Sequence, residues 1–450
     1  MKFLVVAGGC LALVCAAARA DSWSPYEPSL DVAENEKHFL VLGPYDYETH
    51  RTAFAFHARG VGTKPPRVVE SERTEEASVV VDPGDRLIRK GTLEQTPLGA
   101  WMLSATPRAV LFEEYGSIGS GTTLALLGSD GKVKWRHALA DFKFDMKKFR
   151  RSTSSIWWYD GWWVDEARGR IVIAAKGRQV REVELETGKI HDVGESVLLD
   201  ALNSSSIRVR RSVLALCHLA DEKPKGWVKR VVAFRDDTRQ PIALRLEAAW
   251  AVRAEVDDPG SLALYRKAKE RLADQEVREC FLWYAPSSFA AEDSVALLAA
   301  LLRAHPDWRA RDVAATIAGL GGPGIDELDE IACDDKLSSQ LRLAALFGLG
   351  NSRSEYGSAA FAFAVRDTNE KFVAAALKQL DGQVIPPLDR ALAKSLFHAG
   401  AGDAAIAKYL GEHPSESSIA GLEAAAKRAK PDSDAHAAIA AALKNCRKYR

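Results

Sequence analysis

The residue types that most often carry out chemistry in proteins are scattered along this chain. Its ten histidines never occur as HxH or HExxH, the spacings that bring two imidazoles to one metal ion. There is no GxSxG nucleophile turn, no phosphate-binding GxxxxGKS or GxxxxGKT loop and no EF-hand pattern. The sequence therefore identifies no catalytic residue, no metal ligand and no cofactor site, and it favours a protein that is not an enzyme.

Aromatic residues are concentrated in segment 156–164, IWWYDGWWV. If Asp160 and Gly161 form a two-residue turn, the two arms pair as a hairpin. Alternation then predicts one face made of Trp157, Tyr159, Trp162 and Val164, and another made of Ile156, Trp158 and Trp163. Two apolar faces favour burial between the β-core and a second layer. The alternative hypothesis is a ligand platform for a glycan or a partner peptide, formed by Trp157, Trp158, Tyr159, Trp162 and Trp163.

Arginines recur at regular intervals in the second half of the chain. Successive members of the series are 35, 33, 33 and 31 residues apart: Arg210, Arg245, Arg278, Arg311 and Arg342. Val373 occupies the sixth position. Each arginine opens an apolar series with helical spacing, such as Val209, Val213, Leu216 and Leu219. A guanidinium could bind an anion, but so regular a series favours a structural arginine ladder.

These arginines must be positioned by pairs of helices. Second helices are expected between them, at 227–234, 261–272, 291–303 and 357–365, with Asp, Gly and Pro residues marking the turns. Two helices in each period cannot bury an apolar face alone. We therefore expect residues 201–450 to form an α-α superhelix, with 404–443 as degenerate terminal repeats.

This pattern resembles the short bacterial form of the HEAT repeat, in which an Asp-rich turn precedes a helix that begins with an apolar residue and Arg. Asp237, Asp274, Asp307 and Asp335 lie four to eight residues before the next arginine of the series. The resemblance implies that such carboxylates cap the helices and meet the arginines. It also implies a scaffold that binds other proteins.

Residues 21–200 have short apolar or alternating runs and many glycines, which predicts an antiparallel β-domain of about a dozen strands. Hairpin turns are expected at 129–131, 160–161, 167–169 and 187–188. Segments 124–135 (LALLGSDGKVKW) and 182–190 (EVELETGKI) resemble the strand-turn-strand element of quinoprotein-type β-propeller blades. The strands suffice for about three blades, fewer than a closed propeller needs. We expect a partial propeller-like array or a sandwich, completed by packing against the first helical repeats.

Residues 1–20 read as a secretory signal peptide, with an apolar run followed by Ala18-Arg19-Ala20. The mature protein is thus expected in the periplasm or outside the cell. No later apolar stretch is long enough to predict a membrane span. The chain has 61 basic and 61 acidic residues, and this balance predicts no binding to nucleic acid. Four cysteines remain after cleavage, Cys217, Cys280, Cys333 and Cys446, and their spacing leaves disulfide pairing open.

From the sequence we expect an exported, non-enzymatic scaffold that binds another envelope or extracellular protein through its helical array. The alternative is a glycan or cell-wall binding protein that uses the Trp-rich hairpin. An enzyme with its site between the two domains is a third hypothesis.

Overall fold

The computed structural model describes residues 29–46, 51–63, 66–70, 77–93, 97, 99–112, 122–151, 156–253, 259–351, 358–365, 367, 369–379, 386–396, 403–431 and 433–448. The expected signal peptide lies outside the described residues. The chain divides into two compact units, Met1–Val256 and Asp257–Arg450.

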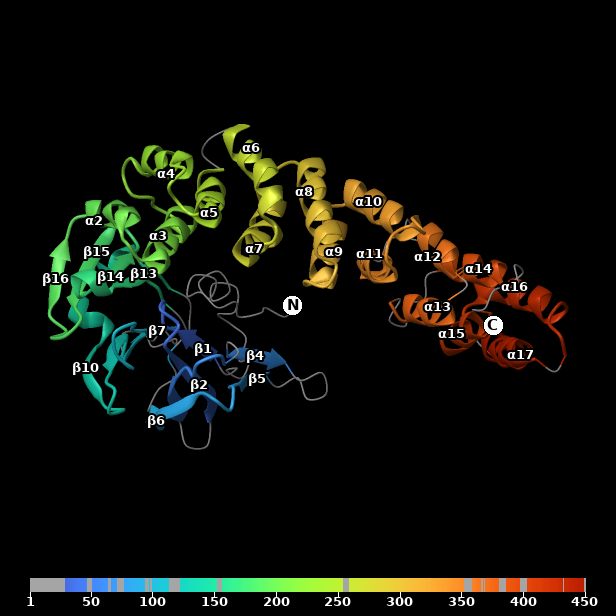
Figure 1. Ribbon diagram of the computed structural model, residues 1–450, viewed down its shortest axis with the longest axis horizontal. Helices are drawn as coiled ribbons and strands as arrows, with labels where there is room; N and C mark the ends of the chain where they lie inside the picture. The colour runs from blue at the N-terminus through green and yellow to red at the C-terminus, as the bar shows by residue number, and fades with distance from the viewer. Residues whose placement is uncertain are drawn as a thin grey trace. The chain divides into compact units, whose positions relative to one another are not determined.

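The first unit begins with three four-stranded antiparallel sheets (Figure 1). Sheet I comprises β1 (Ser29–Val32), β2 (His38–Asp46), β3 (Arg51–Ala58) and β6 (Arg86–Leu93). Sheet II comprises β7 (Gly99–Met102), β8 (Ala109–Phe112), β9 (Leu124–Leu127) and β10 (Val133–His137). Sheet III comprises β13 (Tyr159–Asp165), β14 (Arg170–Ala175), β15 (Gln179–Glu184) and β16 (Ile190–Val193). Within the described residues these sheets close into neither a barrel nor a propeller.

Two small ladders accompany the sheets: β4 (Arg67–Glu70) with β5 (Ala77–Val80), and β11 (Arg150–Arg151) with β12 (Ile156–Trp157). Three expected hairpin turns are confirmed, because β9 pairs with β10, β13 with β14 and β15 with β16. Gly131, Gly169 and Gly188 have positive φ angles in these turns, a conformation that glycine adopts without strain.

Sheets I and II share an apolar core in which Leu40 and Phe56 meet Met102 and Leu111. A second core joins sheet II, sheet III and the first helices of the chain. Those helices are α2 (Ser196–Asp200), α3 (Ile207–Leu219), α4 (Trp227–Asp236) and α5 (Ile242–Val252). Because α3 packs on β13, the first helices belong to the same compact unit as the sheets, and this unit extends past residue 200 to Val256.

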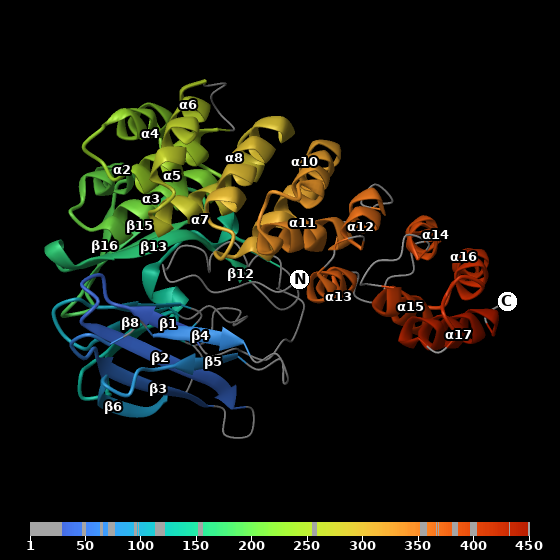
Figure 2. The ribbon, with the colours of Figure 1, turned by 45° about the vertical axis from the view of Figure 1, so that its right-hand side comes forward.

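The second unit is entirely helical in its described residues. One row of neighbouring helices comprises α8 (Ala291–Ala304), α10 (Gly322–Cys333), α12 (Ser358–Ala364), α14 (Pro386–Ser395) and α16 (Glu416–Ala426). The other comprises α9 (Ala310–Gly319), α11 (Ser339–Asn351), α13 (Glu370–Lys378), α15 (Asp403–Glu412) and α17 (Asp434–Arg447). The rows lie side by side in Figures 1 and 2. This arrangement is consistent with helical repeats.

Helices α6 (Pro259–Ala268) and α7 (Gln275–Tyr284) precede these rows, and α7 packs against α8. Short 3-10 helices connect longer elements at Leu139–Phe142, Met146–Lys148, Glu166–Arg168, Ala201–Asn203, Lys269–Arg271 and Ala285–Ser287. Among the described helices, none is both long and apolar enough to span a membrane.

Candidate functional site

The Trp-rich segment does not form the expected two-residue hairpin, and that prediction was wrong. Residues Ile156 and Trp157 pair with β11, whereas Tyr159–Asp165 is one strand that pairs with β14 along its length. The ladder shifts register between Tyr159 and Gly161, so Asp160 and Gly161 lie within the strand at a bulge. The apolar partner strand β14, with the sequence RIVIAA, explains the difference, because it offers the aromatic residues a longer ladder than their own arms could form.

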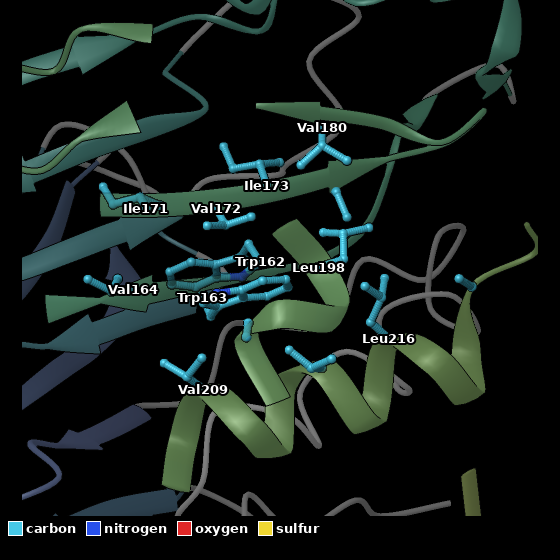
Figure 3. Close-up of a cluster of buried hydrophobic side chains, with 14 of the residues drawn as sticks. Trp162, Trp163, Val164, Ile171, Val172, Ile173, Val180, Leu198, Val209 and Leu216 are labelled. Carbon is cyan, nitrogen blue, oxygen red and sulfur yellow. The ribbon is translucent and has the colours of Figure 1, made fainter. Parts of the chain in front are cut away.

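The expected division of the aromatic rings between two faces was wrong for Trp158, whereas Tyr159 and Trp162 share one face and Trp163 lies on the other, as expected. Trp158 and Trp162, expected on opposite faces, both stack on Phe112 of sheet II, with ring centroids 5.6 Å and 4.8 Å from that ring. Tyr159 contacts the edge of the same ring at 4.9 Å. Trp163 points the other way, toward α3, where Val209 and Leu216 lie (Figure 3). The side chain of Trp157 lies outside the described residues.

Burial decides what these rings can do in this conformation. Trp158 is 3% exposed, Trp162 is 7% exposed and Trp163 is 0% exposed. A carbohydrate platform presents the face of a ring to solvent, and these three rings offer none. Their contacts instead join sheet II, sheet III and α3 into one apolar core.

Charged side chains gather where sheet III meets the segment after α3. The Lys176 ammonium group contacts the carboxylates of Asp160 and Asp221. Burial raises the pKa of Asp160, and the hydrogen bond from Lys176 opposes this effect. The adjacent space has a volume of about 10 Å³, enough for about one water molecule. This cluster is therefore an ion-pair network that ties β13 to the chain after α3, with no room for a substrate.

Three arginines of the regular series make the same kind of structural contact. Arg245 Nε donates to the Arg235 carbonyl at 2.7 Å, and Arg342 Nε donates to the Ala332 carbonyl at 3.2 Å. Arg278 Nη1 donates to the Leu272 carbonyl at 2.8 Å. Each acceptor lies at or just after the end of the preceding helix, where carbonyl groups lack partners within the helix. Arg210 differs, because it donates to the side chain of Gln240 instead.

A second set of contacts connects neighbouring helices of the second unit through cation–π pairs. The guanidinium of Arg278 lies 5.2 Å from the Trp308 ring, and that of Arg311 lies 5.2 Å from the Phe347 ring. Arg309 reaches back to Trp283 at 4.9 Å. The sequence analysis missed these aromatic partners. The signal was available, since Trp308 and Phe372, whose ring lies 4.3 Å from the Arg342 guanidinium, each lie just before a position of the arginine series.

Turn carboxylates contribute less to the ladder than the HEAT resemblance implies. Asp367 accepts a 2.9 Å hydrogen bond from Arg342, as that resemblance leads one to expect. Asp237 instead pairs with Arg239 at 2.8 Å. Asp274 caps its own helix by accepting from the Glu276 amide, which the resemblance also implies. Carbonyl and aromatic partners thus hold most of the arginines.

Partly exposed aromatic residues accompany this ladder on α7, on α11, on α12 and just before α9. Trp283, Trp308 and Phe347 are half-buried, and Phe363 of α12 is 39% exposed. Trp and Arg side chains are the residues that most often dominate protein interfaces. Trp283, Trp308 and Phe347, together with the arginines that they contact, are the candidate functional site.

Other chemistry finds little support in the described part of the chain. No group of three or more His, Cys, Asp or Glu residues there is arranged to hold a metal ion. The four cysteines are free thiols, and burial raises the pKa of Cys217 to about 12, which suppresses its reactivity as a nucleophile. No protein-family model matches the chain, and no curated protein matches it either.

Proposed function

We propose that this chain is an exported, non-enzymatic scaffold that binds another envelope or extracellular protein through a HEAT-like helical solenoid. Two observations carry the proposal: two rows of helices pack side by side, and arginine and aromatic side chains remain partly exposed on α7, on α11 and just before α9. A row of stacked helices offers an extended surface, and extended surfaces of this kind suit protein ligands.

The three sheets of the first unit, in this proposal, form a partial propeller-like array. Each consists of four antiparallel strands, and the last one is covered on one side by α3. The glycan-binding alternative draws no support from the Trp-rich segment, because its described tryptophan rings are buried. Export rests on the apolar run and the Ala18-Arg19-Ala20 site in the first twenty residues.

The proposal can be tested with the full chain carrying a C-terminal tag in its native host. We expect the tagged protein in the envelope or medium, beginning at Asp21, with one protein crosslinked near stoichiometry. Crosslinks mapped by mass spectrometry should lie in residues 257–450. Crosslinks confined to the β-sheets, or retention on isolated cell-wall glycan without a protein partner, would contradict the scaffold.

A further inference from the structure

The exposed residues of α7 and of the three helices α9, α11 and α13 change in character from one helix to the next. Aligning Arg278, Arg311, Arg342 and Val373 also aligns the residues around them, because the helices repeat. The positions two residues before these four hold Glu276, Arg309, Gln340 and Lys371. The positions one residue after them hold Glu279, Asp312, Leu343 and Ala374. The positions five residues after them hold Trp283, Thr316, Phe347 and Lys378. All twelve are exposed or half-exposed. We call these twelve residues the docking face.

The charge of the docking face changes from one end to the other. Helix α7 contributes two carboxylates, from Glu276 and Glu279, and α13 contributes two ammonium groups, from Lys371 and Lys378. Between them, Arg309 and Asp312 neutralise each other in a 2.7 Å ion pair. The face is therefore acidic at α7 and basic at α13.

The apolar residues of the docking face lie mainly on α11, beside its basic end, and Trp283 accompanies the two carboxylates on α7. Helix α11 contributes Leu343 and Phe347 with no charged residue among the twelve, and α13 adds Ala374. Arg311 stacks on Phe347 at 5.2 Å and adds one positive charge at the edge of this patch. An apolar patch between two charged ends suits a ligand with an apolar anchor, since burial of that anchor supplies affinity while the ends fix its orientation.

We propose that the docking face binds one elongated segment of a partner protein, with basic residues over α7, an apolar side chain over Leu343 and Phe347, and acidic residues over α13. This inference rests on the proposed scaffold function and adds the chemistry and the direction of the ligand. Neighbouring helices are separated by about 10 Å, so the four helices span about 30 Å. That length matches about nine residues of extended chain or about twenty residues of helix.

The test uses the full chain and a designed peptide of about twelve residues, with lysines at one end, leucine and phenylalanine in the middle and glutamates at the other end. A second peptide has the same composition with its charges alternating. We expect the segregated peptide to bind at least about tenfold more tightly, as measured by titration calorimetry. A photo-crosslinker at its lysine end should label α7.

Charge reversal provides the sharper measurement. Lys371→Glu with Lys378→Glu should weaken binding of the segregated peptide by about tenfold or more. Adding Glu276→Lys and Glu279→Lys to that variant should restore binding of the same peptide in the opposite orientation. The crosslinker at its lysine end should then label α13. The control is the double variant Asp326→Lys with Glu330→Lys on α10 of the other row. It changes the net charge by the same amount as the two α7 substitutions, and it should leave binding unchanged.

Equal affinity for the two peptides, labelling of α13 in the unmodified protein, or no rescue by the fourfold reversal would overturn the inference. A native partner that crosslinks to residues 257–450 and tolerates Lys371→Glu with Lys378→Glu would also overturn it while leaving the scaffold intact. If the proposed scaffold function were wrong, no native partner would crosslink to residues 257–450 at all.

Discussion

The guanidinium of Arg342 lies 4.3 Å from the centroid of the Phe372 ring, so a side chain of α11 stacks on α13. The same guanidinium donates to the Ala332 carbonyl near the end of α10 and to the Asp367 carboxylate before α13. At 5% exposure it is a buried cation whose hydrogen bonds and ring contacts replace water. One residue of the regular series thus connects three helices.

Replacing Arg342 should therefore destabilise the protein more than replacing an exposed arginine. We expect Arg342→Ala to lower the free energy of unfolding by about 2–4 kcal/mol, because it leaves a carbonyl and a carboxylate without their partner. Urea unfolding followed by circular dichroism measures the loss. The control is Arg266→Ala, whose ion pair with Asp293 lies at the surface and should contribute less than about 1 kcal/mol. Equal losses for the two variants would refute the structural role of Arg342.

Replacing either of two glycines with alanine is expected to change the stability of the protein in opposite directions. A Cβ on Gly348 of α11 would lie 2.7 Å from the Ala314 carbonyl oxygen of α9, whereas one on Gly319 would meet nothing within 4 Å. Gly348→Ala should force the two helices apart and cost about 1–3 kcal/mol. Gly319→Ala should be neutral or add up to about 1 kcal/mol, because alanine favours the helix. Thermal unfolding of both variants measures the contrast, and a stable Gly348→Ala protein would show that α9 and α11 are not so closely packed.

Asp389 predicts an unusual dependence of stability on pH. Its side chain is fully buried in α14, and among the described residues neither carboxylate oxygen accepts a hydrogen bond of good geometry, although the Ser415 hydroxyl lies near enough to interact. Burial raises the pKa of Asp389 to about 6, an effect that the nearby Ser415 hydroxyl partly opposes. The folded protein then holds this proton more tightly than the unfolded chain, so the stabilisation is present below about pH 4 and is lost as the pH rises through 6.

We expect Asp389→Asn to remove this component and to make the protein more stable at pH 7, by up to about 3 kcal/mol. Urea midpoints measured from pH 4 to pH 7 for the two proteins should diverge as the pH rises. Asp326→Asn, at an exposed position of α10, is the control and should follow the unmodified protein. Parallel curves for Asp389→Asn and the unmodified protein would show that the carboxylate is already neutralised by a partner.

Local sequence patterns predicted helices and three of the four expected hairpin turns, but not the partner of the Trp-rich strand. The arginine series and the turn residues located α4, α8 and α12 closely, because spacing of apolar residues along a helix is a local property. The pairing of Tyr159–Asp165 with β14 was missed, since a strand takes the partner that buries it best and local turn signals compete with that choice. The aromatic partners of the arginines were missed for a related reason, because they lie one repeat further along the chain.

Trp163 distinguishes a core residue from a ligand platform. Its ring is fully buried on the side of sheet III that faces α3, and Gly161 in the same strand lies against Leu216 (Figure 3). Trp163→Ala should leave a large cavity between the sheet and the helix and lower the free energy of unfolding by about 3–5 kcal/mol. Val133→Ala, at a position 41% exposed on β10, is the control and should cost less than about 1 kcal/mol.

The same pair of variants should be titrated with soluble oligosaccharides while tryptophan fluorescence is recorded. We expect no quenching in the unmodified protein at folded conditions, because the described rings of segment 156–164 face the core. A Trp163→Ala protein that keeps its stability but loses a measurable affinity for a glycan would reverse this interpretation, since a buried ring cannot be removed without cost while a platform ring can. Loss of cooperative unfolding together with the absence of glycan binding would instead assign the tryptophan to the contact between sheet III and α3.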